Sequence, residues 1–240
     1  MARPRKDLNL RAVLFDVDFT LAKPGPDLGP EGYQLLGRRY GLELDPAKHA
    51  EARAAAIETL EKHPELNHDE EVWVLFTERI IRGMGGDSDR AYEAAVEMTQ
   101  GWEHAHNFEL FEDTLPVLEE LRRHDLMIGL VSNTGRDLDA FMSHHSLVVD
   151  AAVSSGAFGK VKPDPSIFRA ALHRLGVRPR QAAMVGDSPE DDIAGARAIG
   201  MRAFLVDRED RYPDYFGRLT DLRELPAALG LSDTPAREGG

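Results

Sequence analysis

Short apolar segments alternate with helical patterns over most of the chain outside residues 24–110. Four of these segments have the length and composition of buried strands, and they are residues 12–15, 126–131, 182–185 and 203–206. The spacing of apolar residues also predicts helices over 167–175 and 193–199, each followed by a glycine suited to a helix C-terminus. Short buried strands that alternate with helices are typical of a parallel sheet with helices on both faces. The pattern therefore predicts an α/β fold with a Rossmann-like, doubly wound parallel sheet.

Residues 24–110 show a different pattern. They begin with a segment rich in proline and glycine and continue with long helical patterns, without a convincing strand. The candidate helices are residues 32–40, 47–63, 69–82 and 87–103. We therefore expect an all-helical insertion over residues 24–110, placed within an α/β core formed by residues 1–23 and 111–240.

Composition and charge narrow the range of partners. The 240 residues include 29 basic and 42 acidic side chains, a net charge of −13, and no cysteine. This balance disfavours nucleic acid and anionic membrane surfaces as partners, because both attract basic surfaces. The absence of cysteine excludes disulfides, thiolate metal sites and a cysteine nucleophile. No segment approaches the roughly 18 apolar residues of a membrane span, so we expect a soluble, cytoplasmic protein.

Polar side chains follow the predicted strands at the points where these strands end. The candidates are Asp16, Asp18 and Thr20 after the first strand, Ser132 and Asn133 after the second, Asp187, Asp191 and Asp192 after the third, and Lys162 in a loop before a helix. Ligands of open α/β sheets bind outside the carboxyl ends of the strands. We therefore expect these carboxylates, hydroxyls and the ammonium group to meet at one edge of one sheet.

Phosphoryl transfer through an aspartate requires this combination of groups. One carboxylate attacks phosphorus, and a neighbouring carboxylic acid protonates the leaving oxygen and then serves as base for the hydrolytic water. Two carboxylates so close do not easily ionise together, so their pKa values separate and their roles divide. Mg²⁺ prefers oxygen ligands and neutralises charge at the nucleophile. A lysine neutralises further negative charge as the phosphoryl group is transferred.

Four motifs resemble those of the haloacid dehalogenase superfamily, in the same order and with similar spacing. They are Asp16-Val17-Asp18-Phe19-Thr20 (DxDxT), Ser132-Asn133, Lys162-Pro163-Asp164-Pro165 and Gly186-Asp187-Ser188-Pro189-Glu190-Asp191-Asp192 (GDxxxxD). The helical insertion lies where that family places its C1 cap. Within the insertion, the segment Tyr33 to Asp45 and the helix containing Trp73 resemble the cap of the subfamily called haloacid dehalogenase-like hydrolase domain-containing protein 3.

The resemblance implies catalytic roles for four residues. Asp16 would be the nucleophile and Asp18 the general acid and base, while Thr20 would orient the phosphoryl group. Lys162 would bridge the nucleophile and the phosphate. Because the members that cleave carbon–halogen bonds lack an acid at the position of Asp18, dehalogenase chemistry is not expected here. One departure from the family pattern is Phe19, where many members have glycine or a small polar residue.

The resemblance also implies residues that bind phosphate and metal. Ser132 and Asn133 would contact the oxygens of the substrate phosphate. The expected Mg²⁺ ligands are the carboxylates of Asp16 and Asp187 and the backbone carbonyl of Asp18. The family has a second acidic position near the end of the fourth motif, which Asp191 and Asp192 could both fill. We assign a supporting role behind the metal site to Asp192, and Asp191 stays the alternative.

The sequence leaves competing functions open. The favoured function is a Mg²⁺-dependent phosphatase that hydrolyses a small phosphorylated metabolite through an aspartyl-phosphate. A phosphonatase or phosphomutase on the same core is an alternative, but a phosphonatase of this family needs a cap lysine and only Lys48 and Lys62, with Lys23 at the border, are available. A non-catalytic phosphate-binding or interaction protein is the third candidate. Such a protein should have lost Asp16 or Lys162, and both are present.

Overall fold

The computed structural model describes residues 10–62 and 70–231 of the chain. Its internal contacts divide the molecule into two units. One unit runs to Lys23 and resumes at Leu110, and the other comprises Pro24–Glu109. This division places Leu110 with the first unit, whereas the sequence pattern assigned it to the insertion. The two units are described separately below.

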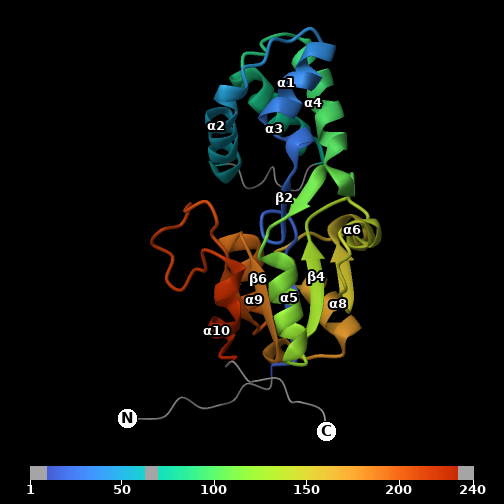
Figure 1. Cartoon of the computed structure of the whole chain (residues 1–240), viewed down its shortest axis with the longest axis vertical. Coiled ribbons are helices and arrows are strands. Elements are labelled where there is room, and N and C mark those ends of the chain that lie inside the picture. Colours follow the sequence, from blue (N-terminus) through green and yellow to red (C-terminus); the bar gives the residue numbers. More distant parts are fainter. Residues whose placement is uncertain (1–9, 63–69, 232–240) are drawn as a thin grey trace. The chain divides into compact units, whose positions relative to one another are not determined.

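The first unit is built on a five-stranded sheet (Figure 1). Its strands are β1 (Ala12–Phe15), β4 (Met127–Ser132), β5 (Ala151–Ser154), β6 (Ala182–Gly186) and β7 (Arg202–Leu205). The order across the sheet is β5-β4-β1-β6-β7, and every neighbouring pair is parallel. The central strand β1 is buried along its whole length, as expected for four apolar residues flanked by strands and covered on both faces. The predicted α/β fold with a parallel sheet is confirmed.

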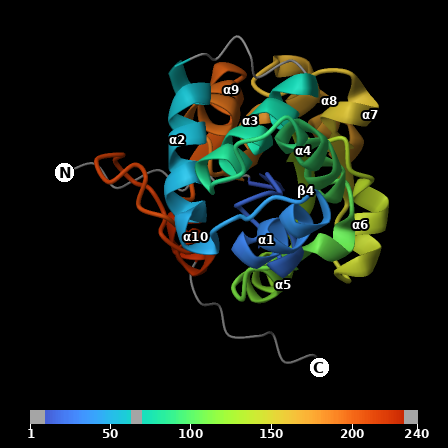
Figure 2. The same ribbon diagram turned by 90° about the horizontal axis from the view of Figure 1, so that it is seen from above.

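Helices lie on both faces of this sheet. They are α5 (Thr114–Arg123), α6 (Leu138–His144), α7 (Ser155–Phe158), α8 (Pro165–Leu175), α9 (Gly195–Ala198) and α10 (Leu225–Leu229). Figure 2 shows α8 and α9 on one side of β4 and α5 on the other. The reason is the order of the strands: the chain crosses from β1 to β4 in one direction and returns from β5 to β6 in the other. Right-handed crossovers in opposite directions place their helices on opposite faces.

The apolar core between the sheet and α8 fixes how closely the elements approach. Leu14 and Met184 of neighbouring strands belong to the same buried cluster as Phe168 of α8. Gly129 on β4 lies against Leu14, and a Cβ atom on this glycine would fall 2.5 Å from a methyl carbon of that leucine. A side chain at this position would have to displace that methyl group, so Gly129 lets Leu14 pack closely against β4.

The described residues of the second unit, 24–62 and 70–109, form four α-helices. They are α1 (Pro30–Arg39), α2 (His49–Lys62), α3 (Glu70–Gly83) and α4 (Arg90–Gly101). Helix α3 packs against α2 and α4, and α1 packs against α4. The expected ends of two helices at His63 and Asp69 lie outside the described residues. Within residues 10–62 and 70–231, no helix combines the length and the apolar composition needed to cross a membrane.

Some predicted elements were wrong or displaced. Strands β2 (Ala22–Pro24) and β3 (Phe108–Leu110) form a two-stranded sheet, so residues 24–110 do contain a strand. Each is only three residues long, too short to show a period of two. The helix expected over 193–199 is a π-helical turn, Pro189–Ala194, followed by the short α9. Short 3₁₀ helices, which the sequence pattern did not indicate, occupy Pro26–Leu28, Pro46–Lys48, Ala105–Asn107, Pro179–Gln181 and Leu222–Glu224.

Candidate active site

Polar residues from three neighbouring strands lie at the carboxyl edge of the sheet. Asp16 directly follows β1, Ser132 is the last residue of β4, and Asp187 directly follows β6. The parallel register brings these ends together: Phe15 is paired with Val185, and the next backbone N–H, that of Asp16, donates to the Val185 carbonyl at 2.9 Å. The structure therefore places these polar residues at the carboxyl edge of the sheet, where the rule for parallel sheets predicts them.

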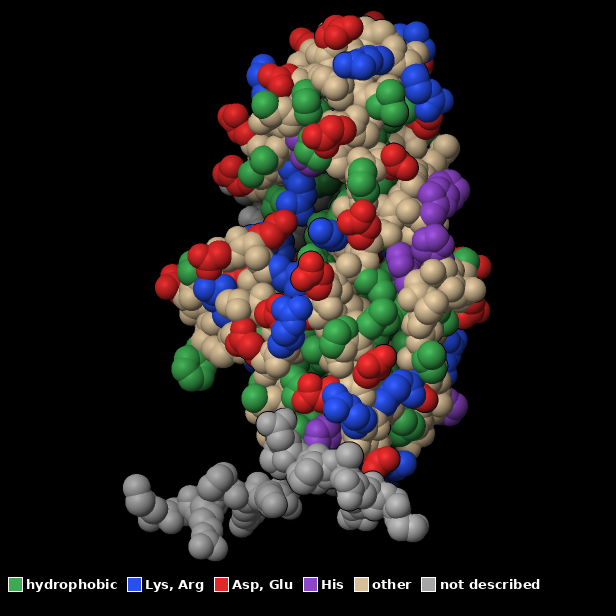
Figure 3. All heavy atoms as spheres, in the orientation of Figure 1, with side chains coloured by type: hydrophobic (Ala, Val, Ile, Leu, Met, Phe, Trp, Pro, Cys, Tyr) green, Lys and Arg blue, Asp and Glu red, His purple; other side chains and the backbone are tan. Residues whose placement is uncertain are grey.

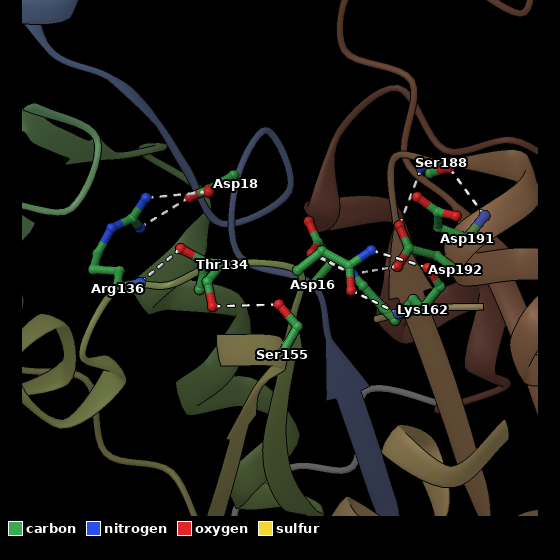
Figure 4. Close-up of polar contacts among 10 residues, drawn as sticks. Asp16, Asp18, Thr134, Arg136, Ser155, Lys162, Ser188, Asp191 and Asp192 are labelled. Atoms are coloured by element: carbon green, nitrogen blue, oxygen red, sulfur yellow. Dashed lines mark hydrogen bonds and ion pairs between the residues drawn. The ribbon is translucent and has the colours of Figure 1, made fainter. Parts of the chain in front are cut away.

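Lys162 lies in a buried cluster of charges at this edge (Figure 4). Its Nζ donates to Oδ1 of Asp16 at 2.5 Å and to Oδ1 of Asp192 at 2.7 Å. All three residues are buried. Burial disfavours the charged form of Lys162, but the two carboxylates outweigh this effect and hold the pKa of Lys162 above its ordinary value. The lysine is therefore an ammonium that donates to both acids at once, and burial, which Lys162 opposes, raises the pKa of Asp192 to about 8.

Asn133 positions the backbone from which Lys162 projects. Its Oδ1 accepts from the Lys162 N–H at 2.7 Å, and its Nδ2 donates to the Lys162 carbonyl at 3.1 Å. The peptide bond between Lys162 and Pro163 is cis. Asn133 thus has a contact that the sequence did not indicate, while its predicted contact with phosphate stays a prediction. The neighbouring Ser132 is buried at the end of β4.

Of the two acids left open by the sequence, Asp192 is the one beside Lys162. Its second oxygen, Oδ2, accepts from the backbone N–H of Ser188 at 3.1 Å. Gly186 makes this position possible, because a Cβ atom there would lie 2.1 Å from Oδ2 of Asp192. Asp191 is half-buried, and its backbone N–H donates to the Ser188 hydroxyl at 3.1 Å. The π-helical turn therefore directs the second of the two adjacent acids into the charge cluster.

Three carboxylates form a group that could hold a metal ion. Oxygen atoms of Asp16, Asp187 and Asp192 all lie within 4.8 Å of one another. Burial, followed by the charge of Asp16, raises the pKa of Asp187 to about 6, and Arg211, which donates to its Oδ2 at 2.7 Å, opposes the shift. Carboxylate oxygens are the hard ligands that Mg²⁺ prefers, so the residues present fit that ion. Two of the three expected ligands, Asp16 and Asp187, belong to this group, and the Asp18 carbonyl stays a prediction.

Asp18 forms an ion pair that the sequence did not indicate. Both of its oxygens accept from Arg136, with distances of 3.0 Å from Nη1 and 3.1 Å from Nη2. Burial raises the pKa of Asp18, and the guanidinium group of Arg136 opposes this shift. In Figure 4, Asp18 and Arg136 lie on one side of Asp16, and Lys162 lies on the other. Each of the two aspartates of the first motif therefore has its own cation.

Thr20 lies in the same unit and is fully buried. Its hydroxyl has no hydrogen-bond partner within the part of the chain that the structure describes, and its carbonyl accepts from Nη2 of Arg208 at 2.8 Å. Arg208 also makes two bonds of 2.9 Å to Asp113 and lies 3.8 Å above the centre of the Phe111 ring. The backbone at Thr20 is therefore fixed, whereas its predicted role in orienting a phosphoryl group stays a prediction.

A loop after β7 adds Arg211 to the site. The buried carboxylate of Asp207 holds this loop by accepting from the N–H groups of Arg211 and Tyr212, each at 2.8 Å, and from Arg218 at 2.9 Å. The loop thereby carries Arg211 to Asp187. Asp207 follows the strand segment 203–206 of the sequence pattern, so the strand-end rule would have found it if it had been applied to the fourth strand. No comparable signal marks Arg211.

These features define an α/β fold with a candidate site at the carboxyl edge of a parallel sheet. The family model described as haloacid dehalogenase-like hydrolase matches residues 13–206, most of the chain. The chain therefore belongs to the haloacid dehalogenase-like hydrolases, and it is a hydrolase. The resemblance stated from the four motifs is confirmed.

Individual relatives agree with this assignment. The chain is 37% identical over 167 residues to the phosphoserine phosphatase of Thermus thermophilus, a match that covers 65% of this chain and 66% of that protein, just under two thirds of its length. It is 31% identical to the haloacid dehalogenase-like hydrolase domain-containing protein 3 of Danio rerio, over 92% of this chain and 96% of that protein. The crystal structure of a phosphatase of this family from Thermococcus onnurineus is similar, with a TM-score of 0.61, 28% identity and coverage of 94% and 100% of the two chains.

Proposed function

We propose that this hydrolase is a Mg²⁺-dependent phosphatase that acts on a small phosphorylated metabolite through an aspartyl-phosphate on Asp16. The observation that carries the proposal is the ion pair between Asp16 and Lys162, with Asp187 and Asp192 beside it. The names of two of the similar proteins, a phosphoserine phosphatase and a phosphatase of the same family, support the same chemistry. We place the protein in the cytoplasm as part of the same proposal.

Asp16 and Lys162 perform the first step. A carboxylate oxygen of Asp16 attacks phosphorus, and the bond from phosphorus to the ester oxygen breaks. Lys162 donates to Asp16 before the attack and neutralises negative charge on the phosphoryl oxygens during it. Asp16, Asp187 and the carbonyl of Asp18 would hold Mg²⁺, which would supply further positive charge for the transfer. Ser132 would hold a phosphoryl oxygen.

Asp18 acts as general acid in the first step and as general base in the second. Its carboxyl group gives a proton to the leaving oxygen as the ester bond breaks. The resulting carboxylate then accepts a proton from the water that attacks phosphorus in the aspartyl-phosphate, which returns Asp16 and releases phosphate. This assignment requires an acid separate from the nucleophile, and the separate cations of Asp16 and Asp18 are consistent with it.

The test is release of phosphate from a panel of sugar, nucleoside and amino-acid monophosphates in the presence of Mg²⁺. The Asp16→Asn variant keeps the shape of the side chain but removes the nucleophile, so kcat should fall at least about 10³-fold. Asp191→Asn is the matched control, since it removes a nearby acid that lies outside the Lys162 cluster. Full activity of Asp16→Asn, with the parent active, would show that the mechanism is wrong.

A further inference from the structure

The ion pair between Arg136 and Asp18 has a feature that a surface ion pair lacks. The side chain of Arg136 is 1% exposed and that of Asp18 is 21% exposed, and the two terminal nitrogens of the guanidinium group contact the two oxygens of the carboxylate. Such a fork fixes the plane of the carboxylate as well as its distance. Asp18 lies in the short turn after β1, where a single bond would leave the carboxyl group free to rotate.

Arg136 is itself held at both ends. Its backbone N–H donates to the hydroxyl of Thr134 at 3.1 Å, and its guanidinium carbon lies 5.2 Å from the centre of the Phe141 ring. The next residue, Asp137, caps α6 by accepting from the N–H groups of two residues in its first turn. The arginine is therefore placed by the end of β4 on one side and by the start of α6 on the other.

The loop that follows β4 consequently positions groups for both catalytic roles, those of the nucleophile and of the acid. Asn133 fixes the backbone of Lys162, the cation of the nucleophile, and Arg136 three residues later fixes Asp18, the acid. We propose that Arg136 is a positioning residue that holds the carboxyl group of Asp18 where it can reach the leaving oxygen. This inference rests on the proposed phosphatase function. Both oxygens of Asp18 can keep their contacts with Arg136, because the oxygen that donates its proton to the leaving group still has a lone pair that accepts from the guanidinium.

The nature of the leaving group distinguishes this role from a structural one. When the ester bond breaks, its electron pair goes to the leaving oxygen, and an alkoxide needs the proton of Asp18 whereas a 2,4-dinitrophenolate does not. The second step follows the departure of the leaving group and does not enter kcat/KM. Loss of the position of Asp18 should therefore lower kcat/KM for alkyl phosphates and leave that for 2,4-dinitrophenyl phosphate nearly unchanged.

The experiment compares kcat/KM of the parent and of Arg136→Met on three esters: 2,4-dinitrophenyl phosphate, phenyl phosphate and an alkyl monophosphate that the parent hydrolyses. We expect a loss of about 10²-fold or more on the alkyl ester, the size of a general-acid contribution, and less than about tenfold on the dinitrophenyl ester. Arg136→Lys keeps the positive charge but cannot form the paired hydrogen bonds to both carboxylate oxygens, so it should recover part of the lost kcat/KM. Asp18→Asn should show the same dependence on leaving group, and adding Arg136→Met to it should change kcat/KM little.

Arg122→Met is the matched control, because this arginine pairs with Asp150 away from the site and its loss should leave all three rates unchanged. An equal loss on all three esters, or a rise in KM alone, would overturn the positioning role, since these are the results of a structural or phosphate-binding role. If Arg136→Met does not fold, as judged by thermal unfolding, Arg136→Lys carries the same comparison. A parent protein that hydrolyses none of the esters would instead reject the phosphatase function itself.

Discussion

At the scale of single residues, the site is a balance of buried charges. Lys162 compensates Asp16 and Asp192, and all three are buried. Removing an ammonium and two carboxylates from water is costly, and the cost is recovered only while the groups stay paired. The arrangement therefore makes the stability of the fold depend on the same residue that we propose assists the nucleophile.

Replacement of Lys162 by methionine should destabilise the protein by about 3–5 kcal/mol, because it leaves two buried acids without their cation. The double variant Lys162→Met/Asp192→Asn should be less destabilised than the sum of its single changes, since it also removes one of the uncompensated charges. Urea unfolding at pH 7 in the presence of a chelator measures all three free energies. Lys160→Met, at an exposed position in the same loop, is the control and should change stability by less than about 0.5 kcal/mol. Additive effects would show that the two residues are not coupled.

At the scale of elements, the apolar segments predict the sheet well but not its weakest strand. β5 reads Ala-Ala-Val-Ser, which has too little apolar surface to stand out from a loop. It forms because β4 offers it a partner and α8 covers it. The same kind of tertiary context extends β4 to Ser132, one residue past the predicted end, so that a candidate phosphate ligand is itself part of the sheet.

The residues of the site also divide into those that the sequence pattern predicts and those that it does not. Those at strand ends, such as Asp16 and Asp187, follow from the rule that parallel strands end at one edge. Arg136 and Arg211 do not, because they reach the site from loops whose shape depends on long-range contacts. An arginine six atoms long can turn toward the site or toward water from the same loop position. Sequence pattern alone does not distinguish these two cases.

In the helical unit, the burial of Tyr33 can be tested by the pH dependence of the free energy of unfolding. Tyr33 of α1 is 2% exposed, and burial raises its pKa to about 12. Above pH 10 the unfolded chain loses the phenolic proton while the folded protein keeps it, so the free energy of unfolding falls as pH rises. Between pH 9 and 11 the contribution of Tyr33 should fall by about 1 kcal/mol. Tyr33→Phe removes this contribution, so the difference in unfolding free energy between parent and variant should change by that amount over the same range. A difference independent of pH would contradict the assignment.

At the scale of the whole molecule, negative charge is unevenly divided along the sequence. Residues 24–110 hold 18 acidic and 8 basic side chains, a net charge of −10, whereas the other 153 residues hold 24 and 21, a net charge of −3. On the face shown in Figure 3, acidic and basic side chains are interspersed, so attraction of an anion depends on local groups there. In the proposed function, a phosphate ester would therefore be attracted by Lys162 and by the Mg²⁺ that the carboxylates would hold, against the repulsion from the net negative charge.

This repulsion should select against polyanionic substrates. At low ionic strength and saturating Mg²⁺, kcat/KM for an inorganic polyphosphate should be well below that for a small monophosphate, because repulsion grows with the charge of the substrate. Added salt shortens the Debye length to about 8 Å at 0.15 M, which weakens repulsion from distant charges but not attraction within the site. Raising the salt concentration should therefore increase the ratio of the two kcat/KM values in favour of the polyphosphate. The monophosphate serves as the internal control for effects of salt on the metal or on the reaction. Faster cleavage of the polyphosphate at low salt would show that local groups, and not the net charge of −13, govern which substrates approach the site.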